Sequence, residues 1–232
     1  MTDTLRNRVV LVTGASRGIG AATCLRLAAL GATVARVARG DMPPVDRAVD
    51  YRADLADPGA REAFLDQLVA DHGVPHAVVN NAGAFILAPL EDTSHGLLRE
   101  QLAINLEAPF AIARRLLPLM RKRGSGRHIL VGSVSDTRAY PENAAYAASK
   151  FAARGMHEVL LEEYRGSGVQ CTLVSPGPTD TTVWDPFDPD NRDGFLGREA
   201  MLRPDDVADA IVWAATRPAR SHVESIRLSP GA

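Results

Sequence analysis

The chain has 232 residues, a length that suits one large domain with a full hydrophobic core. Hydrophobic residues make up 46% and charged residues 23%, which is ordinary for a globular protein. The formal net charge of −2 provides no overall positive field, so we expect no nucleic-acid partner. We also expect a cytoplasmic protein with no membrane partner, because no signal-peptide-like segment opens the chain and no apolar run reaches the ~20 residues that span a bilayer.

Strand and helix patterns alternate along the chain. Short apolar runs rich in Val, Ile and Leu predict strands at about 8–14, 33–38, 48–52, 76–80, 127–133, 169–175 and 224–228. Apolar residues at helical intervals predict helices at about 21–30, 58–72, 93–123, 142–166 and from 203 onward. We therefore predict an α/β fold: a doubly wound parallel sheet of about seven strands with helices on both faces, in a single domain over 1–232.

The cysteines and histidines give no sign of a metal site. Cys24 falls in the first helical pattern and Cys171 in a late strand pattern, so we interpret both as small buried hydrophobes of a protein from a reducing compartment. The six histidines lack metal-ligand spacing, and no metal is predicted.

The segment TGASRGIG at 13–20 joins the first predicted strand to the first predicted helix. Gly14, Gly18 and Gly20 allow the backbone to turn tightly and to approach a ligand, while the helix N-terminus directs free N–H groups at an anion. This arrangement suits a dinucleotide pyrophosphate. A nucleotide-hydrolysing P-loop is excluded, because no G-K-[ST] sequence follows the turn.

Tyr146 and Lys150 lie four positions apart in the predicted helix, and therefore on one face of it. Lysine is rare here: 24 of the 26 basic residues are arginines, and Lys122 is the only other lysine. A nearby cation stabilises a phenolate, so we expect Lys150 to lower the Tyr146 pKa from about 10 by roughly 2–3 pH units before burial opposes it. The alternative is a solvated pair on a surface helix.

Six motifs in the same order resemble those of the classical branch of the short-chain dehydrogenase/reductase (SDR) family. They are TGASRGIG, ADL at 53–55, NNAG at 80–83, Asn105 in INLEAPF, Ser133 thirteen positions before Tyr146, and YAASK followed by PGPTDT at 176–181. The resemblance covers nearly the whole chain. It implies a Rossmann-type sheet that binds a nicotinamide cofactor at the carboxyl ends of its strands.

The resemblance also implies the residues of the site. Tyr146 would be the acid and base, Lys150 would also hold the nicotinamide ribose, Ser133 would orient the substrate oxygen, and Asn105 would hold a water that relays protons. Asp54 would bind the adenine amino group beside Leu55. The remaining cofactor contacts would come from Gly14, Ser16, Arg17, Gly18, Ile19 and Gly20 in the first turn, Asn80, Ala82 and Gly83 beneath the ribose, and Pro176, Gly177, Thr179 and Thr181 near the nicotinamide.

The residues after the second strand bear on the cofactor type. Ala38 and Arg39 stand where relatives that prefer NAD carry an aspartate for the ribose hydroxyls. Arg39, with Arg17 as a second cation, suits a 2′-phosphate. We predict NADP(H), with NAD(H) as the alternative because Asp41 follows closely.

One long irregular stretch, 182–200, is predicted to be a lid on the substrate side, with a simple mobile insertion as the alternative. Trp184, Phe187, Phe195 and Met201 could form an apolar substrate wall, and Tyr140 is a further pocket residue.

The sequence thus predicts an NADP(H)-dependent reductase of a small ketone, aldehyde or 3-oxo acid. A regulatory protein that senses NADP(H) without turnover, or an epimerase or dehydratase of the same family, are the alternatives. The chain ends in SHVESIRLSPGA and lacks the glycine-rich V-x-G-G ending of many relatives. The long helices at 93–123 and 142–166 resemble those that build family homodimers and homotetramers.

Overall fold

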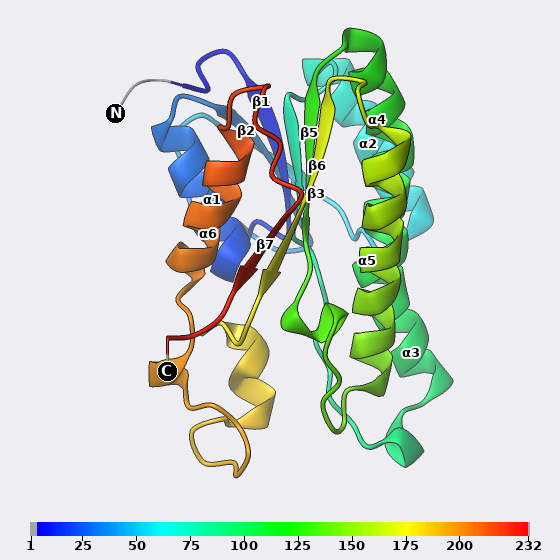
Figure 1. The fold of residues 1–232 in the computed structure, drawn as a ribbon, viewed down its shortest axis with the longest axis vertical. Coiled ribbons are helices and arrows are strands. Elements are labelled where there is room, and N and C mark those ends of the chain that lie inside the picture. Colours follow the sequence, from blue (N-terminus) through cyan, green and yellow to red (C-terminus); the bar gives the residue numbers. More distant parts are fainter. Residues whose placement is uncertain (1–3, 232) are drawn as a thin grey trace.

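Seven parallel strands form the centre of the fold in residues 4–231, the part of the chain that this computed structural model describes (Figure 1). Their order in the sheet is β3-β2-β1-β4-β5-β6-β7. The chain winds one way from β1 and the other way from β4, and open α/β sheets bind ligands at such a switch point. The predicted doubly wound parallel sheet is confirmed. The strands are β1 Val9–Thr13, β2 Thr33–Ala38, β3 Ala48–Arg52, β4 Ala77–Asn80, β5 Gly126–Val131, β6 Val169–Pro176 and β7 Ser225–Leu228.

Helices cover both faces of the sheet. In Figure 1, α1 and α6 lie on one side of the sheet, and α2, α4 and α5 lie on the other. The helices are α1 Gly18–Ala29, α2 Pro58–His72, α3 His95–Leu102, α4 Ala108–Arg123, α5 Ala144–Glu163 and α6 Pro204–Ala215. Local sequence sets several of their ends: the Asp57 side chain accepts a hydrogen bond from the Ala60 N–H at 2.6 Å at the start of α2, and Gly124 ends α4 with a φ of 76°.

The core has two layers because side chains alternate along each strand. Val10 and Val12 of β1 pack toward Leu27 and Ile211 of α1 and α6, whereas Leu11 packs toward Leu116 of α4. Cys24 lies in the first layer and Cys171 in the second, and both are free and buried, as predicted. Burial raises the pKa of each thiol to about 12, so both stay protonated.

The single helix predicted over 93–123 is wrong in detail. Helix α3 and helix α4 are joined by a π-helical turn, η2, at Ala103–Glu107. A π turn inserts one extra residue into the helical register, which apolar periodicity does not reveal. Asn105 lies in this turn and is buried.

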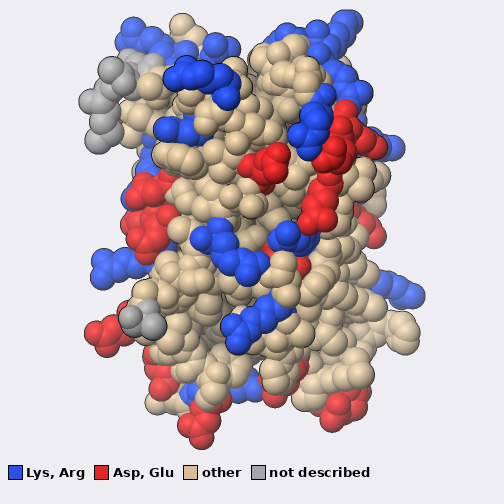
Figure 2. Space-filling model, viewed as in Figure 1, with Lys and Arg blue, Asp and Glu red and all other residues tan. Residues whose placement is uncertain are grey.

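The predicted lid follows β6 at the carboxyl end of the sheet, where it forms the lowest part of the molecule in Figure 1. It contains two short 3₁₀ turns, η4 Thr182–Phe187 and η5 Arg198–Ala200. Two further 3₁₀ turns, η1 Leu90–Asp92 and η3 Val134–Asp136, also lie at this end. Figure 2 shows basic and acidic residues interspersed over the face it presents.

Two absences hold for the described residues. No helix within 4–231 is long and apolar enough to cross a membrane. Nor does this part of the chain contain a group of three or more His, Cys, Asp or Glu side chains that could hold a metal ion.

Candidate active site

A cavity of about 900 Å³ opens at the carboxyl ends of the strands, between the glycine-rich turn and the lid. Most residues that the sequence assigns to the site line it: Gly14, Ser16, Arg17, Gly18, Ile19, Arg39, Asp54, Leu55, Ala82, Gly83, Asn105, Ser133, Tyr140, Tyr146, Lys150, Pro176, Gly177, Thr179, Thr181 and Trp184. Gly20 and Asn80 do not line it, and of the predicted apolar wall Phe195 lines it whereas Phe187 and Met201 do not.

The glycine-rich turn depends on close backbone approaches. Gly14 and Gly18 have φ values of 66° and 54°, a region that favours glycine. A Cβ atom on Gly14 would lie 2.8 Å from the Cα of Ala82, and one on Gly20 would lie 2.2 Å from the Gly14 carbonyl oxygen. Gly20 therefore serves the packing of α1 on the turn. No side chain caps the N-terminus of α1, so its free N–H groups face the cavity and fit an anion such as a pyrophosphate.

Two residues that the sequence analysis did not assign hold the neighbouring turn in place. Thr13 Oγ1 accepts hydrogen bonds from the N–H groups of Asn81 and Ala82 at 3.0 and 2.9 Å. The Asn81 amide donates to the carbonyls of Thr13 and Gly14 at 3.0 and 3.2 Å. Asn80 instead points away from the cavity, where its Nδ2 lies 2.9 Å from His128 Nε2. Asn80 therefore supports β4 and β5 rather than the cavity wall.

Arg39 directly follows β2 and presents an exposed guanidinium at the cavity. The Arg39 side chain is 76% exposed, and its Nη1 lies 3.9 Å from Asp54 Oδ2 across the cavity wall. Asp41 does not line the cavity, and its Oδ1 lies 3.8 Å from Arg52 Nη1. Asp54 is therefore the acid that lies beside Arg39 at the cavity.

Ser133, Tyr146 and Lys150 all line the cavity. The Ser133 hydroxyl accepts a hydrogen bond from the Ser135 N–H at 3.1 Å and also hydrogen-bonds Tyr146. Lys150 Nζ donates to the Val131 carbonyl at 3.1 Å, which directs the ammonium between β5 and the Tyr146 ring. All three side chains are nearly buried.

In the protein alone the Tyr146 pKa is raised rather than lowered, and the lowering expected from Lys150 before burial opposes it stays a prediction. The Tyr146 pKa is raised to about 12, mainly by burial; the interaction with Ser133 lowers it and the charge of Asp136 raises it. Burial also lowers the Lys150 pKa to about 8, against the opposing effect of Asp136. Desolvation outweighs the attraction between the two groups, because both leave water on folding.

Asn105 has little spare hydrogen-bonding capacity. Its Nδ2 donates to the Ala84 carbonyl at 2.9 Å and to Ser149 Oγ at 3.0 Å, and its Oδ1 accepts from the Ala84 N–H at 3.0 Å. Asn105 therefore fixes the segment after Gly83 against α5, and a Cβ atom on Gly83 would lie 2.9 Å from Asn105 Oδ1. Its predicted role in holding a relay water stays a prediction.

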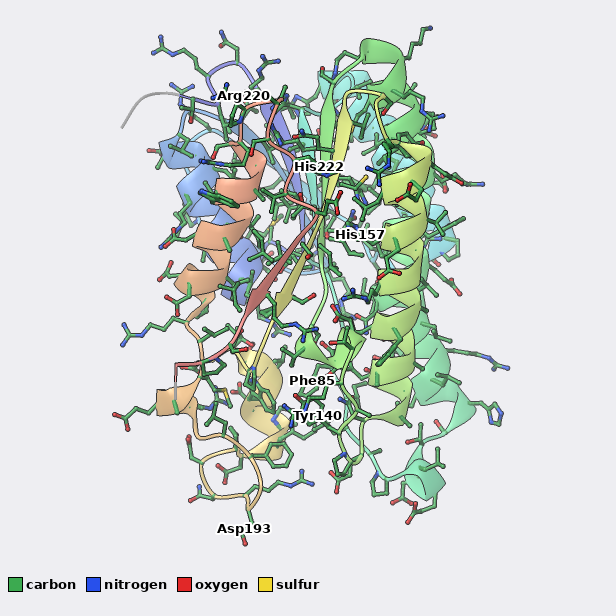
Figure 3. The ribbon with its side chains drawn as sticks, viewed as in Figure 1. Phe85, Tyr140, His157, Asp193, Arg220 and His222 are labelled. Atoms are coloured by element: carbon green, nitrogen blue, oxygen red, sulfur yellow. The ribbon has the colours of Figure 1, made fainter. Side chains whose placement is uncertain are left out.

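A row of aromatic rings leads from Tyr146 to the lid. Phe85, which the sequence analysis missed, makes edge-to-face contacts with Tyr146 at 4.8 Å and with Trp184 at 4.9 Å between ring centres. Trp184 in turn contacts Phe195 at 6.0 Å. In Figure 3, Phe85 and Tyr140 lie at the lid end of the sheet. This half of the cavity is therefore apolar and aromatic.

Ion pairs fasten the lid. Arg198 contacts Asp180 and Asp185 at 2.8 and 2.6 Å, within or beside the lid. Arg192 contacts Glu142 at 2.5 Å, which ties the lid to the segment before α5. The lid is thus attached at both ends of the cavity mouth, while Asp193 lies at its outer tip (Figure 3).

Comparisons with known proteins agree with this geometry. The sequence profile of the short chain dehydrogenase family matches residues 8–192. D-threitol dehydrogenase of Mycolicibacterium smegmatis is 32% identical over 91% of this chain and 87% of its own. The crystal structure of a metagenomic short-chain oxidoreductase in complex with NADP is 30% identical, covers 99% of both chains and has a TM-score of 0.81. An alcohol dehydrogenase from the archaeon Thermococcus sibiricus, complexed with 5-hydroxy-NADP, is 26% identical with a TM-score of 0.82 over 95% of both chains. The chain belongs to the short-chain dehydrogenase family of oxidoreductases.

Proposed function

We propose that this protein is an NADP(H)-dependent oxidoreductase that interconverts a carbonyl group and a secondary alcohol. The observation that carries the proposal is the placement of Ser133, Tyr146 and Lys150 in the same cavity as an uncapped helix N-terminus and its glycine-rich turn. An acid–base group and an anion-binding turn in one crevice suit a reaction between a dinucleotide and a small molecule.

The residues of the chain would perform the proton half of the reaction. The bound nicotinamide supplies a hydride to the carbonyl carbon, or accepts one in the reverse direction. Tyr146 gives its phenolic proton to the carbonyl oxygen, and Ser133 donates a hydrogen bond to the same oxygen and orients it. Lys150 carries positive charge beside Tyr146 and favours the phenolate that remains. The alcohol and the oxidised cofactor leave, and the Tyr146 phenolate takes a proton back from solvent, so each turnover consumes one hydride and one proton.

The preference for NADP(H) rests on Arg39. Its exposed guanidinium lies at the cavity wall after β2, and Asp41 is turned toward Arg52. A 2′-phosphate would gain a charge-assisted hydrogen bond from Arg39, whereas ribose hydroxyls would meet no carboxylate at the end of β2 itself, where Ala38 and Arg39 stand. Two similar structures were determined with NADP or a derivative of it, which supports the proposal.

The aromatic row indicates the substrate. Phe85, Trp184 and Phe195 present ring faces and edges to the space beside Tyr146. We infer a ketone, aldehyde or 3-oxo acid that carries an apolar group, because such a group gains burial against the rings. The lid at 182–200 would exclude water from this space.

Location and assembly complete the proposal. Two buried free cysteines suit the cytoplasm, where thiols stay reduced.

Phe110 of α4 and Phe151 of α5 are exposed, and burial of these faces would support a homodimer or homotetramer.

Activity is tested by mixing the purified protein with NADPH or NADH and a panel of ketones, aldehydes and 3-oxo acids. Loss of cofactor absorbance with time measures turnover. We expect turnover with NADPH and at least one apolar ketone. A sensor would be favoured instead if the protein binds NADPH tightly but reduces no compound of the panel and oxidises none of the corresponding alcohols with NADP.

A further inference from the structure

Asp136 is the most deeply buried charged group beside the active site, and the proposed reaction does not use it. It ends the η3 turn, three residues after Ser133, and its side chain is 0% exposed. Its Oδ1 atom lies 3.6 Å from Arg154 Nη1 of α5 and 3.6 Å from Arg227 Nη2 of β7. A buried carboxylate needs such partners, because an unpaired charge inside a protein is costly.

The second oxygen of Asp136 faces the backbone that carries Ser133. Oδ2 accepts hydrogen bonds from the Ser133 N–H at 3.5 Å and from the Ser175 hydroxyl of β6. Gly132 makes this approach possible, since a Cβ atom there would lie 2.7 Å from Oδ2. The carboxylate therefore fixes the strand end from which the Ser133 side chain enters the cavity.

Asp136 also lies close enough to the acid–base pair to affect its charge. Arg154 is one helical turn beyond Lys150 on α5, so both cations lie on the side of the helix that faces η3. The charge of Asp136 raises the pKa of Lys150, which burial lowers, and it raises the pKa of Tyr146 as well. The charged groups around Asp136 are therefore Arg154 and Lys150 from α5 and Arg227 from β7, while β6 contributes only the neutral Ser175.

We propose that Asp136 is a positioning residue of this active site, which ties the Ser133 turn to α5 and β7 through Arg154 and Arg227. Asp136 does not line the cavity, so it acts through Ser133 and Lys150 and not on the substrate. The role rests on the proposed function, because it assumes that Ser133, Tyr146 and Lys150 are the reacting groups. The proposal also gives a positioning role to Arg227 of β7, a residue that lies far in sequence from the motifs of the site.

Replacement of Asp136 by Asn removes the charge and keeps the shape. In Asp136→Asn we expect kcat for carbonyl reduction to fall on the order of tenfold, with the affinity for NADPH within about twofold of the natural protein. The pH at which kcat/KM is lost on the alkaline side should move lower by about half a pH unit or more, because Lys150 loses the anion that favours its charged form. A purely structural role would lower stability without moving that pH.

A second, safer variant protects the test against misfolding. Arg227 is 51% exposed on the edge strand, so Arg227→Gln should fold and should lower kcat in the same direction by a smaller factor. In the double variant Asp136→Asn with Arg227→Gln, the fold decrease in kcat should be smaller than the product of the two single decreases, because the groups form one network. The control is Arg165→Gln, which breaks an exposed pair with Glu162 at the C-terminal end of α5 and should change neither kcat nor the pH profile.

Two measurements separate this proposal from the proposed function. Tyrosinate absorbance, taken as the difference between each protein and its Tyr146→Phe form, reports the Tyr146 pKa without turnover. A lower value in Asp136→Asn supports the role of Asp136 even if no carbonyl is reduced. The role of Asp136 would be overturned if the natural protein turns over and Asp136→Asn changes neither the alkaline side of the kcat/KM profile nor the tyrosinate titration. That result would leave the proposed activity intact.

Discussion

The Nζ atom of Lys150 lies 5.7 Å from the centre of the Tyr146 ring, and its own hydrogen bond goes to the Val131 carbonyl at 3.1 Å. Lys150 thus has a fixed place beside the phenol but does not donate to it. Because both side chains are buried, each loses hydration and each pKa moves toward the neutral form.

Tyr146→Phe should abolish the reaction and spare the cofactor site. The phenol supplies the proton, and the ring still fills the space against Phe85. We expect kcat to fall by about 10³-fold or more, with the NADPH dissociation constant changed by less than about threefold. Steady-state turnover and quenching of protein fluorescence by NADPH measure the two quantities.

Tyr164→Phe is the matched control for that variant. Tyr164 is a buried tyrosine on the same side of the sheet, packed against Arg121 and outside the cavity. It should retain turnover. If Tyr146→Phe retains turnover as well, the proton comes from elsewhere and the proposed roles fail.

Carbonyl reduction should decline above about pH 8. Burial lowers the Lys150 pKa to about 8, so the positive charge is present below that pH and is lost as pH rises through it. The Tyr146 proton remains in place over the same range, because its pKa is raised to about 12. The measurement is kcat/KM for reduction at pH 6 to 10, which reports groups of the free enzyme.

Lys150→Arg tests the origin of that decline. A guanidinium stays charged throughout this pH range. The variant should be weaker at every pH, because the Val131 hydrogen bond needs the shape of lysine, but its profile should be flat from pH 7 to 9. A decline at the same pH in Lys150→Arg would show that another group titrates.

Arg39→Gln should weaken NADPH and leave NADH nearly unchanged. The guanidinium is the exposed cation at the end of β2, and a phosphate of nearly two negative charges depends on it. We expect KM for NADPH to rise about tenfold to a hundredfold and KM for NADH to change by less than about twofold. Arg114→Gln, which removes an exposed arginine paired with Glu62, serves as the control. An equal loss for both cofactors would show that Arg39 does not discriminate between them.

Local spacing predicted the parts of the site that lie on one element. Gly14 and Gly18 share one turn, and Tyr146 and Lys150 share one helix, so periodicity and motif order place them together. The same reasoning predicted the strands, because each is a short apolar run that needs only its own residues to be recognised.

Contacts between distant segments could not be predicted in this way. Phe85 after β4 meets Trp184 after β6, and Asp136 after β5 meets Arg227 of β7, so each contact joins segments that are two strands apart in the sheet and distant in sequence. Nothing in the residues around Phe85 or Asp136 indicates a partner, since a lone aromatic or acid after a strand is common. The π turn at Asn105 was missed for another reason: one inserted residue leaves the apolar period almost unchanged.

Trp184→Ala should reduce activity on bulky apolar ketones more than on small ones. The indole contacts Phe85 and Phe195, and its Nε1 donates to the Thr179 carbonyl at 3.0 Å. It therefore forms part of the cavity wall, and the hydrogen bond holds it in place. We expect kcat/KM for an aryl ketone to fall about tenfold or more, with acetone changed by less than about threefold. Trp213→Ala on α6 removes a tryptophan outside the cavity and should leave kcat/KM for both ketones unchanged. If kcat/KM falls equally for both ketones, the indole only packs the lid and does not contact the substrate.

Two buried histidines should make the fold sensitive to acid. His128 of β5 is fully enclosed, with its Nε2 against Asn80. His157 of α5 lies beside the sheet in Figure 3, and its Nε2 lies 3.2 Å from the Glu224 carbonyl. Burial lowers the pKa of His128 to about 3 and that of His157 to about 4, against 6.5 for the unperturbed side chain.

The sign of the pH effect follows from proton counting. Between pH 6.5 and 4 the unfolded chain binds a proton at each histidine and the folded chain does not, so acid favours unfolding over that interval. Stability is therefore complete above pH 6.5 and is lost as pH falls toward 4, at about 3 kcal/mol for each histidine. Urea unfolding at a series of pH values should show this slope, and His128→Leu should make it shallower because one proton fewer is taken up. Exposed His95 offers the control, since His95→Gln leaves the buried pair intact and should keep the slope of the natural protein. A slope in His128→Leu as steep as that of His95→Gln would mean that the carboxylates, and not these histidines, set the acid limit of the fold.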